Sequence, residues 1–297
     1  MQPAKMAFPR GWSMTFVVAS LFAAQPALNA PSIPREDQGR LLAQGEAGFV
    51  GRFHPAASTA PRRAVLVLGG AEGGVPDELA SSLLGQDRPV LAVAYFKAEG
   101  LPAELERIPI EYVGGAIDWL QSQGGVAADD IAIVGWSKGA ELALVLAAQD
   151  PRVSRVVAIA PSHVVWAGIL SDWTKVPGSS WTLDGEPLPS VPFDASGQPE
   201  GLRALYEQSL RNLDAVNAAA IPIERSQAKL LLLSGGKDEV WPAGAMADAL
   251  CQRAARRAGF PRCEHHASPT LGHLLDGEAT TPGHALQQRI ERFLAEP

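Results

Sequence analysis

The chain has 297 residues, 46% of them hydrophobic, so it is long enough to bury a large core within one domain. Its 25 basic and 32 acidic residues give a formal charge of −7 at pH 7. No block of Lys and Arg suits a phosphate backbone or an anionic membrane surface. The charge balance therefore argues against nucleic acid as a partner.

The first thirty residues differ in composition from the rest of the chain. Two basic residues, Lys5 and Arg10, precede an apolar run over residues 14–24, and small residues follow up to position 30. This order is typical of a secretory signal peptide. The run is about half as long as the roughly 20 residues of a membrane-spanning helix, so no stable span is expected. We expect residues 1–30 to be a signal peptide and the protein to be periplasmic or secreted; the alternative is a cytoplasmic protein with a mildly hydrophobic N-terminus.

The chain has only two cysteines, Cys251 and Cys263, and they lie close together in sequence. In an exported protein they would pair as a disulfide, whereas in the cytoplasm they would be two separate thiols. Neither their surroundings nor a His-Glu-x-x-His pattern elsewhere provides the ligands of a zinc site. No metal and no cofactor are expected.

Short apolar runs alternate with helical patterns along most of the chain. Residues 31–63 are rich in Pro, Gly and Ala and are predicted to form an extended lead-in, with an edge strand over 48–54. After it, buried strands are predicted at 64–68, 90–95, 131–134, 153–160, 230–234 and 263–267, and helices at 76–84, 108–123, 140–148, 202–218 and 283–294. This alternation predicts an α/β catalytic domain over 64–297, with a mostly parallel central sheet and helices on both faces.

Residues 161–226 interrupt this alternation. The interval is rich in Pro and Gly and contains Trp166, Trp173 and Trp181. It is too long for a plain connection. Because ligands bind at the carboxyl ends of parallel strands, we expect it to be a lid over the site, with the three tryptophans as its substrate-facing residues. The alternative is a solvent-facing excursion whose tryptophans pack locally.

The candidate nucleophile is Ser137, in the motif Gly135-Trp136-Ser137-Lys138-Gly139. A G-x-S-x-G pattern alone is weak evidence in a chain with 29 glycines. Here it lies between a predicted strand and a predicted helix, which is where the nucleophile elbow of an α/β-hydrolase lies. The sharp turn lifts the serine hydroxyl above the sheet, and the glycines allow close backbone approach.

The serine needs a base and an acid, which in this fold follow it in the order Asp or Glu, then His. His273 is the candidate base, because it lies in a loop before the last helix. The other histidines fall outside such a position: His54, His163, His265, His266 and His284. Asp238, in the loop after the strand at 230–234, is the candidate acid; Glu239 and Asp276 are the alternatives.

The negative charge of a tetrahedral intermediate needs hydrogen-bond donors already in place. Backbone amides are expected to provide them, one from Lys138 and one from the glycine-rich loop after the first buried strand, at Ala71 or Glu72. That loop has neither the Gly-Lys-Ser or Gly-Lys-Thr ending of a P-loop nor a G-x-G-x-x-G pattern, so it is not expected to bind a nucleotide.

The residues resemble the catalytic domain shared by acyl-CoA thioester hydrolases and bile acid-CoA:amino acid N-acyltransferases, which is dienelactone-hydrolase-like within the α/β-hydrolase superfamily. The resemblance covers residues 64–297. The segments that carry it are 68–74, 92–96 with Leu101-Pro102, 135–144, Ile221-Pro222-Ile223-Glu224-Arg225, 235–238 with Trp241, and Gly272-His273.

The resemblance implies a triad of Ser137, Asp238 and His273 that attacks an acyl thioester or ester substrate. Members with a serine nucleophile lean toward hydrolysis, and members with cysteine lean toward acyl transfer to an amine. Larger members carry an N-terminal β-sandwich of roughly 100 residues, which residues 31–63 cannot build. CoA is a cytoplasmic metabolite, so an exported member would cleave another ester, thioester or amide.

Three hypotheses follow from the sequence. The first is a serine hydrolase of acyl thioesters or carboxylic esters that acts through an acyl-enzyme on Ser137. The second is an acyltransferase that uses the same residues and an amine or alcohol acceptor. The third is an exported binding protein that keeps the fold without catalysis, which the complete and ordered triad disfavours.

Overall fold

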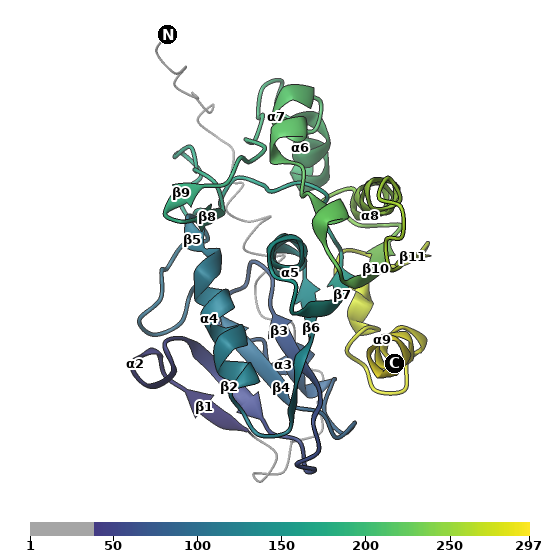
Figure 1. The fold of residues 1–297 in the computed structure, drawn as a ribbon. Coiled ribbons are helices and arrows are strands. Elements are labelled where there is room, and N and C mark those ends of the chain that lie inside the picture. The colour runs from purple at the N-terminus through teal and green to yellow at the C-terminus, as the bar shows by residue number, and fades with distance from the viewer. Residues whose placement is uncertain (1–38) are drawn as a thin grey trace.

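A computed structural model describes residues 39–297, and Figure 1 shows their arrangement. Residues 1–30, predicted as a signal peptide, lie outside the described residues.

The core of the structure is an eight-stranded sheet in the order β1-β2-β4-β3-β6-β7-β10-β11. The strands are β1 Arg40–Leu42, β2 Val50–His54, β3 Arg62–Leu68, β4 Val90–Ala94, β6 Val126–Trp136, β7 Val153–Ile159, β10 Lys229–Gly235 and β11 Cys263–Ser268. The pairs β1/β2 and β2/β4 are antiparallel, and the other five pairs are parallel. The predicted α/β fold with a mostly parallel sheet is therefore confirmed. Strand β2 corresponds to the edge strand expected over 48–54, but it is not the edge of the sheet, because β1, which was not predicted, pairs with its outer side.

Helices cover both faces of the sheet (Figure 1). One face packs against α4 Ile110–Gln121, α5 Lys138–Gln149 and α8 Ala243–Ala254, and the other against α3 Asp77–Ser81 and α9 Ala285–Ala295. A short helix, α2 Gln44–Ala47, lies between β1 and β2. Of these, α2 and α8 were not predicted from the sequence.

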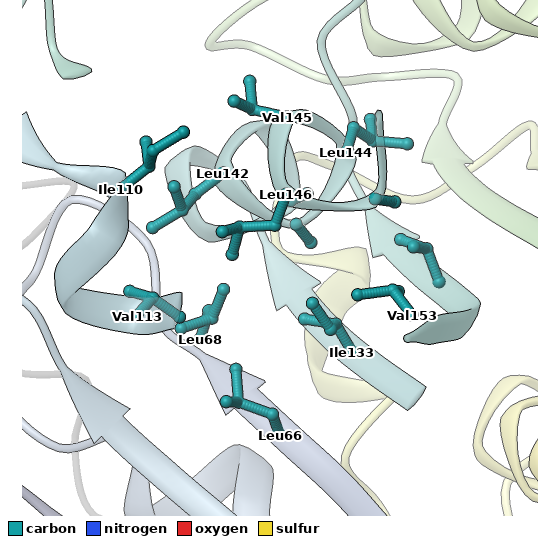
Figure 2. Close-up of a cluster of buried hydrophobic side chains, with 14 of the residues drawn as sticks. Leu66, Leu68, Ile110, Val113, Ile133, Leu142, Leu144, Val145, Leu146 and Val153 are labelled. Atoms are coloured by element: carbon teal, nitrogen blue, oxygen red, sulfur yellow. The ribbon is translucent and has the colours of Figure 1, made fainter. Parts of the chain in front are cut away.

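Alternate side chains of each buried strand enter the two halves of the core. In β3, Leu66 and Leu68 pack on the α4/α5 face, while Val65 and Val67 pack on the α3/α9 face. Figure 2 shows Leu66, Leu68 and Ile133 of the sheet below side chains of α5. Fully burying such a side chain stabilises the fold by about 1.5 to 3 kcal/mol. The buried Ile133 therefore helps to anchor β6, the strand that ends just before the candidate nucleophile.

The insertion 161–226 has secondary structure of its own at the carboxyl end of β7. It contains β8 Trp181–Leu183, β9 Glu186–Pro187, α6 Gly201–Ser209, α7 Leu213–Ala219 and the 3-10 helix η2 Ile223–Arg225. Strands β8 and β9 form a second small sheet with β5 Ile108–Pro109. The single helix predicted at 202–218 is thus two helices. The break has a physical cause, since the Asn212 side chain caps α7 by accepting a hydrogen bond from the Ala215 amide at 3.2 Å.

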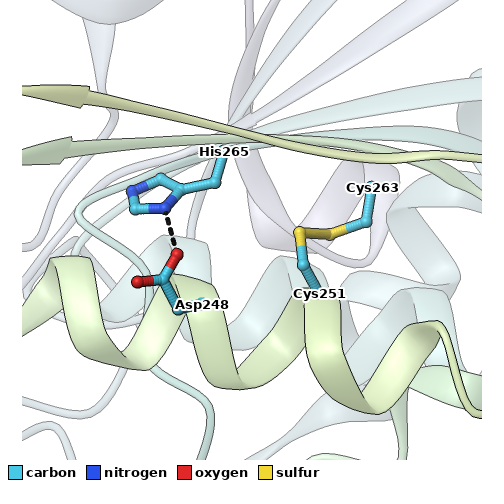
Figure 3. The surroundings of a disulfide bond; sticks show 4 residues. All are labelled: Asp248, Cys251, Cys263 and His265. Carbon is cyan, nitrogen blue, oxygen red and sulfur yellow. Dashed lines mark hydrogen bonds and ion pairs between the residues drawn. A yellow bond between two sulfur atoms is a disulfide. The ribbon is translucent and has the colours of Figure 1, made fainter.

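The two cysteines are joined by a disulfide that links α8 to the edge strand β11 (Figure 3). Beside it, His265 of β11 pairs with Asp248 of α8 at 2.7 Å between Nδ1 and Oδ1. Both links therefore hold the last parallel strand of the sheet to the helix that precedes it.

The disulfide provides a test of this edge of the sheet. Replacing Cys251 and Cys263 together by serine is expected to lower the free energy of unfolding by about 2 to 3 kcal/mol, because the cross-link spans only 12 residues of the unfolded chain. Urea unfolding of the oxidised wild type and of the double variant measures the difference. Equal midpoints and slopes would show that the bridge does not stabilise the fold.

Candidate active site

Ser137 lies in a sharp turn between the end of β6 and the start of α5. Its backbone has φ 54° and ψ −114°, a conformation that costs a residue with a side chain about 1 to 3 kcal/mol. Its amide donates to the Ile159 carbonyl at 2.8 Å, and its own carbonyl accepts from the Glu141 amide at 3.1 Å. The turn therefore has the strand-turn-helix geometry of a nucleophile elbow.

The glycines of the motif are required by close backbone contacts. A Cβ on Gly139 would lie 2.2 Å from the Gly69 carbonyl oxygen, and one on Gly135 would lie 2.3 Å from the Gly139 carbonyl oxygen. Neither contact is sterically allowed. The elbow thus packs directly against the loop that follows β3, which brings Ser137 and that loop together.

His273 connects Ser137 and Asp238. Its Nε2 lies 2.9 Å from the Ser137 Oγ, and its Nδ1 lies 2.9 Å from the Asp238 Oδ2. The three side chains come from the loops after β6, β10 and β11, at the carboxyl edge of the sheet. In the tautomer that these contacts require, Nδ1–H donates to the carboxylate and Nε2 is free to accept the serine proton.

The acid and base loops are held in place by their own backbone contacts. Asp238 Oδ1 accepts from the amides of Val240 and Trp241 at 2.9 and 3.0 Å, which fixes the carboxylate. The Trp241 indole packs edge-on against the His273 ring at 5.4 Å between centroids. A Cβ on Gly235 would lie 2.1 Å from the Gly272 carbonyl oxygen, so the end of β10 touches the histidine loop.

The structure separates Asp238 from Glu239, the first of the two alternatives that the sequence left open. Asp238 is the one hydrogen-bonded to the His273 ring. Glu239, the first alternative, accepts instead from the His273 backbone amide at 3.1 Å through Oε2. Asp276, the second alternative, lies in the 3-10 helix η3 Leu275–Gly277. The role of Glu239 in holding the histidine loop was not predicted.

The two candidate oxyanion donors flank Ser137. Lys138 is the first residue of α5, and the first amides of a helix have no partner within it. In the glycine-rich loop, the Gly70 amide donates to the Glu72 Oε1 at 2.7 Å. Desolvation of the Glu72 carboxyl by the surrounding protein raises its pKa, and hydrogen bonds from the backbone amides of Glu72 and Gly70 partly offset this shift. Of the two loop candidates, Ala71 and Glu72, Ala71 is therefore the one whose amide is not directed at the carboxylate.

A second Ser-His-Asp set lies nearby but lacks the features of a catalytic site. His265 Nε2 lies 2.7 Å from the Ser234 Oγ, and its Nδ1 binds Asp248. Ser234 is only 1% exposed and belongs to the regular strand β10 rather than to a sharp turn. The hydrogen-bond pattern alone is therefore not enough to mark a nucleophile.

The three tryptophans predicted for the lid lie in different environments. Trp166 and Trp181 are fully buried, and Trp173 is partly buried. Trp166 stacks on Phe193 and meets Tyr206 edge-on at 4.6 Å, whereas Trp181 packs against Tyr95. A role of these residues in covering substrate stays a prediction.

The part of the chain that the structure describes contains neither a candidate metal site nor a candidate membrane-spanning helix. Within residues 39–297, no three Asp, Glu, His or Cys side chains are grouped so that they could hold a metal ion. No helix in this range has the length and apolar character needed to cross a membrane.

Comparison with known proteins identifies the family. Residues 108–285, more than half of the chain, match the family described as BAAT / Acyl-CoA thioester hydrolase C terminal. The chain belongs to this family. It is 26% identical over 219 residues to mouse acyl-coenzyme A thioesterase 1, and 27% identical over 216 residues to mouse acyl-coenzyme A amino acid N-acyltransferase 1. Each match covers 73% of this chain and 49% of the relative, so the chain spans about half the length of these curated family members.

Solved structures agree on the fold. The esterase Pf2001 of Pyrococcus furiosus aligns with a TM-score of 0.54 and 14% identity, over 91% of this chain and 95% of that one. A candidate dienelactone hydrolase of Klebsiella pneumoniae aligns with a TM-score of 0.53 and 16% identity, over 83% of this chain and 91% of that one. The family member described here therefore has the α/β-hydrolase fold that the sequence predicts.

His163, at the start of the insertion, gives a pH prediction. Burial lowers its pKa to about 4, the nearby Arg253 adds to this, and its Nδ1 is buried without a hydrogen-bond partner. The unfolded chain takes up this proton near pH 6.5, whereas the folded protein stays neutral down to about pH 4. Stability should therefore be full above about pH 6.5 and fall toward pH 4, by at most ~3 kcal/mol from this group.

The variant His163→Gln should lose less stability than the wild type between pH 6.5 and pH 4.5. Thermal unfolding at several pH values measures the two slopes, and measurements at pH 7.5 serve as the internal reference. Parallel curves for the two proteins would contradict this assignment.

Proposed function

We propose that the chain is a serine hydrolase that cleaves acyl thioesters or carboxylic esters through an acyl-enzyme on Ser137. The observation that carries the proposal is His273, which lies 2.9 Å from both the Asp238 Oδ2 and the Oγ of Ser137, a serine held in the strained turn at the start of α5. This arrangement couples removal of the serine proton to a buried carboxylate that stabilises the resulting imidazolium.

The proposed reaction has two steps. Ser137 Oγ attacks the acyl carbonyl while His273 Nε2 takes its proton, and the amides of Lys138 and Ala71 stabilise the oxyanion. The imidazolium then protonates the leaving thiolate or alkoxide, and the acyl group stays on Ser137. In the second step His273 removes a proton from water, whose oxygen attacks the acyl carbonyl; the bond to Ser137 Oγ then breaks, the imidazolium returns the proton to Oγ, and the carboxylic acid is released.

The family relationship supports an acyl thioester as the substrate class, since several relatives are named acyl-coenzyme A thioesterases. We also infer that the protein is exported. The N-terminal composition and the Cys251–Cys263 disulfide support this, because disulfides persist in oxidising compartments. In such a compartment the leaving group would be another thiol or an alcohol in place of CoA.

Variants of the three side chains test the catalytic proposal. Ser137→Ala is expected to lower kcat by about 10⁴-fold or more, and Asp238→Asn by about 10³ to 10⁴-fold, because the asparagine favours the wrong histidine tautomer. The assay compares acyl-CoA thioesters with simple esters of matched acyl chains. Labelling by a fluorophosphonate probe reports on the nucleophile directly.

Ser234→Ala is the matched control, because it removes a serine hydroxyl that contacts His265 instead of His273. It should leave labelling and kcat close to wild-type values. If the probe labels the Ser137→Ala variant as strongly as the wild type, the nucleophile assignment is wrong.

The second hypothesis, acyl transfer, is supported by the relative named as an amino acid N-acyltransferase. Product analysis with and without an amine acceptor separates the two reactions. Free acid as the dominant product in the presence of acceptor supports hydrolysis, and an amide product supports transfer.

Export predicts a shortened mature protein. When the full chain is expressed in a secreting bacterial host, N-terminal sequencing should place the first residue of the mature protein near position 31. An intact N-terminus at Met1 together with a cytoplasmic location would contradict export.

A further inference from the structure

A buried ion pair lies directly behind the nucleophile. Lys138 and Glu141 are 1% and 0% exposed, and the Lys138 Nζ lies 2.8 and 2.7 Å from the two carboxylate oxygens of Glu141. Lys138 is also the residue whose backbone amide is the proposed oxyanion donor on the elbow side. The pair is not used in the proposed reaction, since its side chains do not contact Ser137 Oγ or His273 in any hydrogen bond of the described residues.

The insertion supplies the remaining partners of this pair. Trp181 Nε1 donates to Glu141 Oε1 at 2.7 Å, and the Trp166 amide donates to the same oxygen at 3.2 Å. The Lys138 Nζ also lies 5.3 Å from the centroid of the Trp181 ring, within the range of a cation–π contact. One carboxylate therefore fastens two points of the insertion to the first turn of α5.

Trp181 also reaches the other side of the proposed oxyanion hole. Its ring packs edge-on against Tyr95 at 5.6 Å between centroids. The Tyr95 hydroxyl donates to the carbonyls of Gly69 and Gly70 at 2.6 and 3.1 Å, immediately before Ala71. A single insertion side chain thus contacts the residue that supports each of the two backbone donors.

The energetics are consistent with a positioning role. Burial lowers the pKa of Lys138 and raises that of Glu141, and each partner opposes the shift of the other. A buried ion pair contributes little net stability compared with apolar residues, but breaking it leaves an uncompensated buried charge. Such a pair strongly favours the one arrangement in which all its hydrogen bonds are made.

We propose that Trp181, through the Lys138–Glu141 pair on one side and Tyr95 on the other, is a positioning residue that sets the spacing of the two oxyanion donors. The inference rests on the proposed function of Ser137. It makes the insertion part of the frame of the active site, in addition to any role as a cover.

The variant Trp181→Phe tests the proposal, because it keeps an aromatic ring and removes the N–H that binds Glu141. It should lower kcat for ester hydrolysis by about 10 to 100-fold with little change in KM, since a small misplacement of donors affects the transition state more than the bound substrate. Affinity for a boronic acid, which forms a tetrahedral adduct on the serine, should fall by a similar factor.

Ser180→Ala is the matched control. Ser180 is fully buried next to Trp181 and donates to the carbonyls of Trp166 and Ala167, so its loss loosens the insertion without touching Glu141 or Tyr95. The control should keep kcat and boronate affinity near wild-type values. A purely structural role predicts instead that both variants lose activity in proportion to their loss of melting temperature, and that result would overturn the proposal.

Tyr95→Phe provides a second, milder variant that removes only the hydroxyl. It should lower kcat in the same way, and the double variant with Trp181→Phe should lose less than the product of the two single effects, because both act on the same loop. Independent, multiplicative effects would count against a shared positioning unit.

Amide hydrogen exchange separates this proposal from the proposed function. Trp181→Ala, which also removes the ring that packs on Tyr95, should raise exchange at residues 69–72 relative to the wild type and to Ser180→Ala, whether or not any tested ester is cleaved. Unchanged exchange in this loop would overturn the positioning role. If the fluorophosphonate probe does not label the wild-type protein, only the hydrolase assignment is refuted.

Discussion

The active site depends on one strained turn, in which Ser137 is held at a positive φ between β6 and α5. Neither side of the turn can relax, because β6 is a central strand and α5 packs its apolar face on the sheet. The absence of a side chain on Gly139 lets the helix start touch the carbonyl of Gly69. The same contact that permits the turn therefore places the glycine-rich loop next to the serine. The proposed nucleophile and the proposed oxyanion loop are therefore positioned by the same packing contact.

The proposed acid and base are positioned by a second packing unit at the edge of the sheet. Parallel pairing of β10 and β11 brings the loops that carry Asp238 and His273 to the same end, and the contact between Gly235 and Gly272 sets how closely they approach. The chain between these loops forms α8, which the disulfide and the Asp248–His265 pair attach to β11. Because β11 has a strand on only one side, these links replace the restraint that a further strand would provide. Stability at this edge is therefore tied to the geometry of the acid–base pair.

Much of this arrangement could be predicted because its signals are local. The apolar run at 131–134 followed by Gly-Trp-Ser-Lys-Gly already predicts a strand, a turn and a helix, and the order of Asp238 and His273 follows from the alternation of strands and loops. The missed features depend on contacts between distant segments. Glu239 looks equivalent to Asp238 in sequence, and only the path of the loop directs it to the backbone of His273 and not to the ring. The short strand β1 lacks a long apolar run, and it joins the sheet by pairing with β2.

The contacts of the insertion also could not be predicted from the sequence, because they join distant segments. Three tryptophans in a Pro-rich segment predict a lid, but sequence alone does not reveal that Trp181 ends on Glu141. Moving this part of the insertion away would leave the carboxylate without two of its donors and expose a buried ion pair, which is a large cost relative to the marginal stability of a protein. Parts without such anchors can move at much lower cost. Val176 and Leu213, which precede and follow the buried Trp181 in sequence, are both more than 60% exposed and carry apolar surface that faces solvent. Movement within the insertion is therefore expected in these outer segments, while its anchored core stays in place.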